Sequence, residues 1–217
     1  MTPRTAITAA EVEGGVLGAA RVLADSGHSA IPIYEGTLDS VIDLGAGYCD
    51  LVNHLRVRER HAIDLWPGFV QHAAPGVTTH VGSVTDMKDL ASASFDAAVS
   101  SNLLEHLEWA ELDRCESEVR RILKPGGRWI LLQPNYRYAS SEYFDDYTHR
   151  IPISHVSLRD FLAAHGWDIL KLIPRFVPLQ HKSWMPLVPA LMHIYLRSPI
   201  RPFAKQMFVV ARKGTSA

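Results

Sequence analysis

The residues best suited to hold a ligand lie between Val41 and Asp50, where a short apolar run ends in Asp43 and leads to Gly45 and Gly47. Glycine lets the backbone approach a ligand where a Cβ atom would collide with it. The acid adds a charged hydrogen-bond acceptor beside that backbone. The pattern predicts a small-molecule site at the carboxyl end of a strand, close to the start of a helix.

A second set of residues with catalytic potential lies in the stretch 143–150. A carboxylate can orient an imidazole and raise its basicity, so an Asp–His pair there could accept a proton. His149 is therefore predicted to act as the base or to bind the substrate, with Asp146 as its partner. His106 is the third candidate, and a structural role in a loop is the alternative for each of the three.

The elements that would position these residues alternate along the chain. Short apolar runs predict five strands, at Val41–Leu44, His61–Asp64, Val77–Val81, Phe95–Val99 and Arg128–Leu132. Helical patterns lie between some of them, a short one at Leu51–Leu55 and the clearest at Glu108–Leu123. The Lys-Pro-Gly-Gly segment 124–127 is predicted to be a turn that ends this helix. The alternation favours a parallel sheet with helices on both faces.

Further elements are predicted on both sides of this core. Residues 14–26 predict a helix before the first strand. After the fifth strand, the pattern predicts a helix at Ser157–His165, a strand at Trp167–Ile173 and a last strand at Gln206–Arg212. A Pro-rich insertion, 174–205, separates the last two strands, and a connection of that length is usually functional or poorly ordered. The length of 217 residues fits one domain.

Four motifs, taken in chain order, resemble those of the class I methyltransferases that use S-adenosylmethionine, of the type 11-like group. They are Asp43-x-Gly45-x-Gly47, Asp64 at the end of the second strand, Ser94-Phe95-Asp96 followed by Asn102–Leu107, and the Leu123–Gly127 turn. The resemblance implies an α/β, Rossmann-like sheet of seven strands, mostly parallel, with helices on both faces and an antiparallel last strand. It also implies a helical cap at 1–36, a cofactor-binding core at 37–135 and a substrate-side part at 136–217.

The resemblance further implies S-adenosylmethionine as the cofactor and S-adenosylhomocysteine as the product. Asp64 would accept hydrogen bonds from both ribose hydroxyls, and Leu65 would lie against the adenine. The implied cofactor-binding residues are Asp43, Gly45, Ala46, Gly47, Asp64, Leu65, Ser83, Val84 and Ser101. The chain departs from the pattern at Cys49, which takes the third glycine position, and at Ser83, where an acid commonly binds the adenine amine.

Charge is unevenly distributed along the chain. After Asp168 there are eight basic residues and no acid, whereas residues 1–168 hold 14 basic and 23 acidic residues. The basic end indicates either an anionic acceptor or surface, or a solvated basic face without a partner. The acidic body disfavours nucleic acid. Apolar and basic residues at 182–205 allow contact with an anionic membrane, and a lid or a dimer contact is the alternative; the oligomeric state is open.

Other chemistries lack their motifs. The dinucleotide-binding pattern Gly-x-Gly-x-x-Gly needs a small third residue for helix packing, and Asp50 takes that position here. The Tyr-x-x-x-Lys pair of short-chain reductases is also missing. No run of His or acidic residues has metal-ligand spacing, so no metal is predicted. Base methylation of DNA is unsupported, because Ser100-Ser101-Asn102-Leu103 replaces the Asn/Asp-Pro-Pro motif. Cys49 and Cys115 fit a reducing cytosol, and the N-terminus lacks a signal-peptide pattern, so a cytoplasmic protein is expected.

The function predicted on this basis is transfer of a methyl group from S-adenosylmethionine to a small-molecule or glycan or lipid-linked acceptor. A hydroxyl is the favoured acceptor group, and an anionic acceptor would suit the basic end of the chain. The alternative is a non-catalytic protein that binds S-adenosylmethionine or S-adenosylhomocysteine on the same scaffold, because fold does not determine function.

Overall fold

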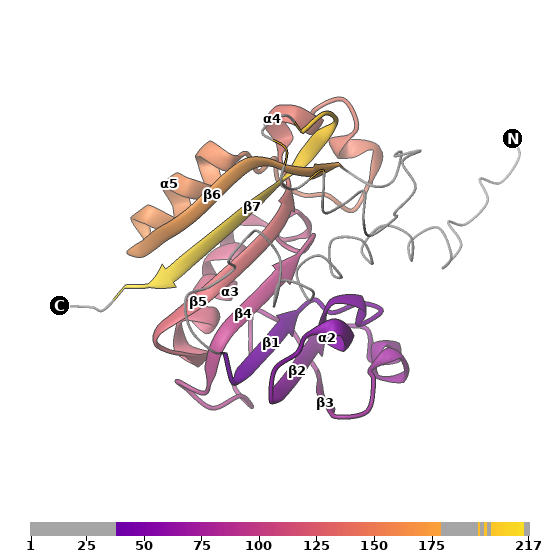
Figure 1. Ribbon diagram of the computed structural model, residues 1–217, viewed down its shortest axis with the longest axis vertical. Coiled ribbons are helices and arrows are strands. Elements are labelled where there is room, and N and C mark those ends of the chain that lie inside the picture. Colours follow the sequence, from indigo (N-terminus) through magenta and orange to yellow (C-terminus); the bar gives the residue numbers. More distant parts are fainter. Residues whose placement is uncertain (1–37, 179–194, 196–197, 199–200, 215–217) are drawn as a thin grey trace, which may run out of the picture.

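A computed structural model describes residues 38–178, 195, 198 and 201–214, and shows one twisted sheet flanked by helices (Figure 1). The seven strands lie in the order β3-β2-β1-β4-β5-β7-β6. They are β1 (Ser40–Leu44), β2 (Glu59–Asp64), β3 (Val77–Val81), β4 (Phe95–Ser101), β5 (Leu123–Pro134), β6 (Trp167–Pro178) and β7 (Ala204–Lys213). β7 runs antiparallel to both β5 and β6, and the other paired strands are parallel. The predicted sheet is confirmed.

Helices cover both faces of this sheet. The described helices are α2 (Asp50–His54), α3 (Trp109–Ile122), α4 (Tyr136–Ala139) and α5 (His155–Ala164), with 3-10 turns η2 (Pro67–His72), η3 (Leu104–His106) and η4 (Tyr143–Asp145). Alternate residues of β1, β4, β5 and β7 face opposite sides, as strand geometry requires. The side chains on one face form the larger hydrophobic core with α3 and α5. The side chains on the other face form a second core that includes Leu51 of α2. The prediction of helices on both faces is also confirmed.

The helix α3 shows how local sequence sets an element. Glu108 and Glu111 form a reciprocal capping box at its start, and its buried face includes Leu112 and Val119. The helix ends at Ile122, and Gly126 has the positive φ, 74°, that the predicted turn requires. β5 begins earlier than predicted, at Leu123: this residue pairs with Phe95 and Arg128 pairs with Ala97, so residues 124–127 bulge out between the two pairs. The Lys124 ammonium, 2.7 Å from Asp96, ties this bulge to β4.

The C-terminal strands are longer than predicted. β6 continues past Ile173 to Pro178 and lies at the edge of the sheet, where proline is tolerated because no partner strand needs its N–H group. β7 begins at Ala204, two residues before the predicted start. The predicted insertion therefore overlaps both strands.

Some predictions concern residues outside the described part of the chain. They include the helix at 14–26, the cap at 1–36 and most of the insertion, including the membrane-contact hypothesis for 182–205. Within the described residues, none of the helices combines the length and apolar character needed to cross a membrane.

Candidate functional site

The turn after β1 has the backbone conformation that the glycine pattern predicts. Gly45 and Gly47 have φ values of 70° and 52°, in the left-handed region that favours glycine. A Cβ atom on Gly45 would lie 2.8 Å from Leu103 Cδ1, so this residue is also needed for packing against the segment after β4. A Cβ atom on Gly47 would meet nothing within 4 Å. The backbone at Gly47 is therefore open to a ligand.

Asp64 is held next to this turn by the backbone. Its carboxylate accepts a hydrogen bond from the Gly47 N–H group at 2.9 Å and from the Trp66 N–H group at 2.8 Å, one on each oxygen. Each oxygen can accept a further bond, because a carboxylate has about four acceptor positions. The adjacent Leu65 is 71% exposed. A fixed carboxylate with spare acceptor capacity and an exposed apolar side chain fit the ribose and adenine of the implied cofactor.

Asp43 is buried at the end of β1. Burial raises the pKa of Asp43 to about 8. A hydrogen bond from the Val52 backbone opposes this rise, and the negative charges of Asp64 and Asp50 add to it. A cation in this turn would favour the charged form of Asp43. The sulfonium and ammonium groups of S-adenosylmethionine are of that kind, so the donor set fits this group.

The other predicted cofactor residues lie around the same edge. Ala46 N–H donates to Ile63 O at 3.2 Å, and Gly82 N–H donates to Asp64 O at 3.0 Å, which holds the loop after β3 beside β2. Ser83 Oγ accepts the Thr85 N–H bond at 3.1 Å. Val84 is buried in the core, so only its backbone can face a ligand, and Ser101 ends β4.

Cys49 adopts the conformation of the glycine that it replaces. Its φ is 59°, and it forms the N-cap of α2. Its side chain is fully buried, with Sγ 3.7 Å from Phe69 O, and burial raises the pKa of the thiol to about 12. The departure from the pattern thus preserves the path of the backbone and adds a buried, unreactive thiol.

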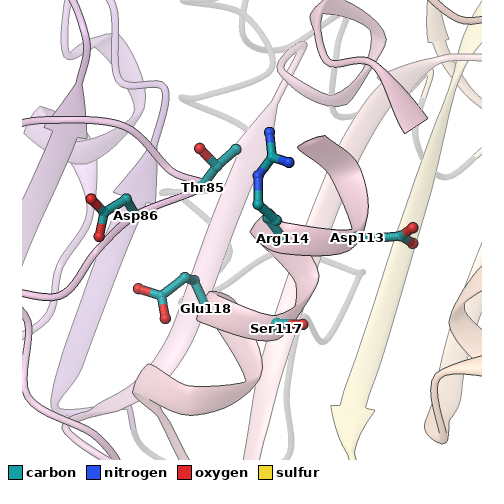
Figure 2. Close-up of a pocket in the computed structure, with 6 residues that line it drawn as sticks. All are labelled: Thr85, Asp86, Asp113, Arg114, Ser117 and Glu118. Atoms are coloured by element: carbon teal, nitrogen blue, oxygen red, sulfur yellow. The ribbon is translucent and has the colours of Figure 1, made fainter. Parts of the chain in front are cut away.

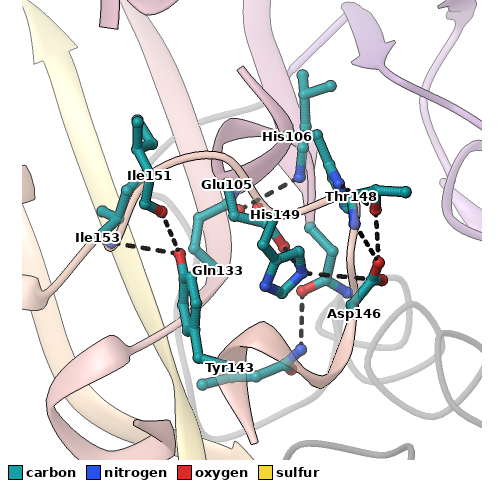
Figure 3. A network of polar contacts seen from close by, with 12 residues as sticks. Glu105, His106, Gln133, Tyr143, Asp146, Thr148, His149, Ile151 and Ile153 are labelled. Carbon is teal, nitrogen blue, oxygen red and sulfur yellow. Dashed lines mark hydrogen bonds and ion pairs between the residues drawn. The ribbon is translucent and has the colours of Figure 1, made fainter. Parts of the chain in front are cut away.

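A second cluster of polar side chains lies where η3 meets the loop after η4 (Figure 3). The Arg150 N–H group donates to Glu105 O at 2.7 Å and docks the loop on η3. Tyr143 fixes the same loop, since its hydroxyl donates to Ile151 O at 3.0 Å and accepts from Ile153 N–H at 3.2 Å. We call Glu105, His106, Asp146, Thr148 and His149 the proton cluster.

The three predicted catalytic residues all lie in the proton cluster. His149 Nε2 is 3.9 Å from Asp146 Oδ2 and 4.0 Å from Glu105 Oε1, and its side chain is only 9% exposed. The His149 ring packs edge-on against the rings of His106 and Tyr143, with centroid distances of 4.9 and 4.7 Å. Tertiary structure thus brings His149 and Asp146 against His106.

Sequence reasoning missed one member of the cluster, Glu105, which lies in the Asn102–Leu107 motif. Glu105 is 1% exposed, and burial raises the pKa of its carboxyl to about 8. Its Oε2 atom accepts no hydrogen bond among the described residues. Thr148, within the predicted stretch 143–150, lies 2.6 Å from Asp146 Oδ1 and 2.9 Å from His106 Nδ1.

A separate depression of about 370 Å³ lies between α3 and the loop after β3 (Figure 2). Its lining residues are Thr85, Asp86, Asp113, Arg114, Ser117 and Glu118. None of the predicted site residues lines it, and Glu118 is already bonded to Arg121 and to the Met87 N–H group. This depression therefore contributes nothing to the site assembled above.

The core of the chain is similar to a known protein family. Residues 42–131 match a family model described as a methyltransferase domain. Among curated proteins, none matches the sequence significantly. The matched range contains the glycine turn, Asp64, Glu105 and His106, whereas Asp146, Thr148 and His149 lie beyond it.

Solved structures resemble the whole described fold. A SAM-dependent methyltransferase from Archaeoglobus fulgidus is 16% identical with a TM-score of 0.63, covering 89% of this chain and 94% of that one. A chain from the complex of the Haloferax volcanii Trm112 methyltransferase activator with its partner methyltransferase is 18% identical with a TM-score of 0.66, covering 96% and 93%. A geranyl diphosphate methyltransferase in complex with SAM is 16% identical with a TM-score of 0.62, covering 91% and 85%. At these identities the similarity shows a shared fold.

Proposed function

Since residues 42–131 form the domain of a class I S-adenosylmethionine-dependent methyltransferase, we propose that the protein methylates a hydroxyl of a small-molecule or glycan acceptor. S-adenosylmethionine is the cofactor of this domain. Asp64, Gly45 and Gly47 would hold its ribose and methionine parts, and Asp43 would face its positive charge. Ala46, Leu65, Ser83, Val84 and Ser101 complete the proposed set around it.

The proton cluster is the observation that supports a hydroxyl acceptor. A hydroxyl must lose a proton as it is methylated, so the reaction needs a positioned base. The cluster offers two imidazoles and lies beside the cofactor turn, because Leu103, which contacts Gly45, comes just before Glu105 and His106. We propose that one of these imidazoles accepts the proton, with Asp146 and the second imidazole in support.

Positive charge on the C-terminal part supports an anionic acceptor. Burial lowers the pKa of His155, and the neighbouring charges of Arg137 and Arg159 lower it further. The Arg175 guanidinium lies over the Tyr138 ring at 5.2 Å, and that ring stacks on His155. Arg159 is paired with Asp160, so Arg137 and Arg175 are the charges that would attract a phosphate or carboxylate on the acceptor.

The test is transfer of a radiolabelled methyl group from S-adenosylmethionine to a panel of matched acceptors. The panel contains sugars, sugar phosphates and lipid-linked glycans, each compared with an amine analogue. We expect product from a hydroxyl acceptor, with an anionic one preferred, and at least a 10-fold loss of turnover in His106→Gln or His149→Gln with cofactor affinity retained.

Other outcomes would contradict parts of the proposal. Transfer only to amines would overturn the hydroxyl assignment, and full turnover in both histidine variants would overturn the role of the cluster. Cofactor binding without transfer to any acceptor of the panel would favour the non-catalytic binding protein.

A further inference from the structure

We propose that His106 Nε2 is the atom that accepts the proton of the acceptor hydroxyl, and that Thr148 and Asp146 position it by fixing the tautomer of His106. This inference rests on the proposed function and assigns the base within it. It also gives a role to Thr148, a residue that the chemistry of methyl transfer alone would not single out.

The first step is the direction of the Thr148 hydrogen bonds (Figure 3). Thr148 Oγ1 lies 2.6 Å from Asp146 Oδ1 and 2.9 Å from His106 Nδ1, and a hydroxyl has one proton to donate. Burial would raise the pKa of Asp146, but hydrogen bonds from the Thr148 side chain and backbone hold it below its usual value. The carboxylate is therefore charged and receives the hydroxyl proton.

The second step follows from the first. Since its proton points to Asp146, Thr148 Oγ1 can only accept a hydrogen bond from His106 Nδ1, which must then carry a hydrogen. A neutral imidazole with hydrogen on Nδ1 has its lone pair on Nε2. The chain Asp146–Thr148–His106 thus leaves Nε2 of His106 as the basic atom.

The loop holds Thr148 rigidly enough for this purpose. The Thr148 N–H group donates to the same Asp146 oxygen at 2.9 Å, and two residues later Arg150 N–H is bonded to Glu105 O. Glu105 precedes His106 directly, so the loop that carries Thr148 is docked on the same short turn, η3, that carries His106. This docking holds Thr148 close to His106.

Both histidines are partly buried, and their contacts separate them. His149 Nε2 lies about 4 Å from both Glu105 and Asp146, and the His149 ring packs against the rings of Tyr143 and His106. His106 lies three residues after Leu103, which packs on Gly45 in the proposed cofactor turn. We assign His149 to the support of the loop and of the His106 ring.

The proposed transfer breaks two bonds and forms two. Bound S-adenosylmethionine supplies a methyl group whose bond to the sulfonium sulfur breaks, leaving the electron pair on sulfur, as the bond to the acceptor oxygen forms. The O–H bond of the acceptor breaks, and its proton passes to the lone pair of His106 Nε2. The resulting imidazolium is stabilised through Thr148 by the Asp146 carboxylate.

A divalent cation is the competing ligand for the same lone pair. One ligand atom each from Glu105, His106 and His149 lies within 4.8 Å of the others. Burial raises the pKa of Glu105 to about 8, so a metal bound there would have to release the Glu105 proton. The Thr148 hydrogen bonds are the observation for proton transfer, and metal binding is an outcome of the test.

The deciding experiment is the ¹⁵N NMR spectrum of the histidine side chains in the labelled full-length protein at pH 8. His106→Gln identifies the signals of His106, so no acceptor is needed. We expect the Nδ1–H tautomer in the wild type and in Thr148→Ser, which keeps the hydroxyl. Thr148→Val should lose this preference, and Thr148→Ala provides a second variant should valine impair folding. The Nε2–H tautomer as the main form of the wild type would overturn the proposal.

Addition of ZnCl₂ to the same samples tests the competing reading. Stoichiometric binding that shifts the signals of both His106 and His149, and that Glu105→Gln abolishes, would overturn the proton-acceptor role. Unchanged signals at equimolar Zn²⁺ would support it.

Turnover with an acceptor from the panel supplies the final readout. We expect Thr148→Val to lower kcat about 10-fold with little change in KM, Thr148→Ser to restore most of it, and His106→Gln to lose about 10²-fold or more. Equal kcat in the wild type and Thr148→Val would overturn the positioning role. The Nδ1–H tautomer without any methyl transfer would overturn the proposed function and leave only the Thr148 hydrogen bonding in place.

Discussion

The cofactor turn and the proton cluster lie at the same edge of the sheet but are built differently. The turn is made largely of backbone: Gly45 and Gly47 provide its shape, and the Gly47 N–H group binds Asp64, 17 residues along the chain. The cluster is made of side chains, and His106 meets Thr148 across 42 residues through a docked loop. Pairing of neighbouring parallel strands brings the proposed cofactor residues together, whereas the cluster depends on docking of the loop 146–150 on η3.

Asp64→Ala should have the largest effect and tests the backbone side of this comparison. The substitution removes the proposed ribose acceptor and releases the N–H groups of Gly47 and Trp66. Two bonds to a charged group, each contributing about 1.5 kcal/mol or more, correspond to a loss of about 100-fold in affinity for S-adenosylmethionine. Calorimetric titration measures it.

Asp86→Ala is the matched control for this measurement. Asp86 lies in the neighbouring loop, but its side chain is 61% exposed and pairs with Lys88 at the surface. The affinity of Asp86→Ala for S-adenosylmethionine should equal that of the wild type. An Asp64→Ala protein that binds within about threefold of the wild type would show that the turn does not depend on this carboxylate.

Glu105→Gln should have an intermediate effect and tests the cluster through the pH dependence of stability. The folded protein keeps the Glu105 proton up to a pKa of about 8, whereas the unfolded chain loses it near the ordinary value of 4.5. The folded state therefore binds more protons between these values, and its stability falls as pH rises through them. Glutamine has no proton to lose in this range, so the Tm of Glu105→Gln relative to that of the wild type should rise from pH 5 to pH 8.

The exposed Glu59, paired with Arg58, provides the control for this second measurement. Glu59→Gln should show a constant Tm difference from the wild type across the same pH range. A constant difference for Glu105→Gln as well would mean that the folded and unfolded states bind the Glu105 proton equally.

Cys49→Gly should have the smallest effect and tests whether the turn depends on its backbone alone. Glycine removes the strain of the left-handed conformation, which stabilises the fold by about 1 kcal/mol. It also removes the buried thiol, which destabilises the fold by about 1 kcal/mol. The free energy of unfolding in urea should change by less than about 1 kcal/mol. Cys115→Gly, in the middle of α3, combines lost burial with a helical glycine and should cost about 2 kcal/mol. Equal losses in both variants would contradict a strained Cys49.

The same contrast explains what could be predicted from sequence. Apolar runs bounded by turns predict β1 to β4 within two residues, because buried parallel strands have a strong local signal. β5 starts at Leu123 rather than at Arg128, because Leu123 already pairs with Phe95 before residues 124–127 bulge out of the pairing. The burial of Glu105 has no local signal at all, because it results from the docking of Arg150 and its loop.

The position of β7 between β5 and β6 has a consequence for synthesis of the protein. When the ribosome has made β6, the place beside β5 is still empty, because the intervening strand is encoded last. β7 also supplies Gln206, whose amide donates to Asn102 Oδ1 at 2.9 Å beside the cofactor edge, and Lys205, whose carbonyl accepts from Asn135 N–H. A nascent chain that stops short of residue 204 lacks an interior strand of its sheet, so synthesis must pass residue 213 before this edge can be assembled.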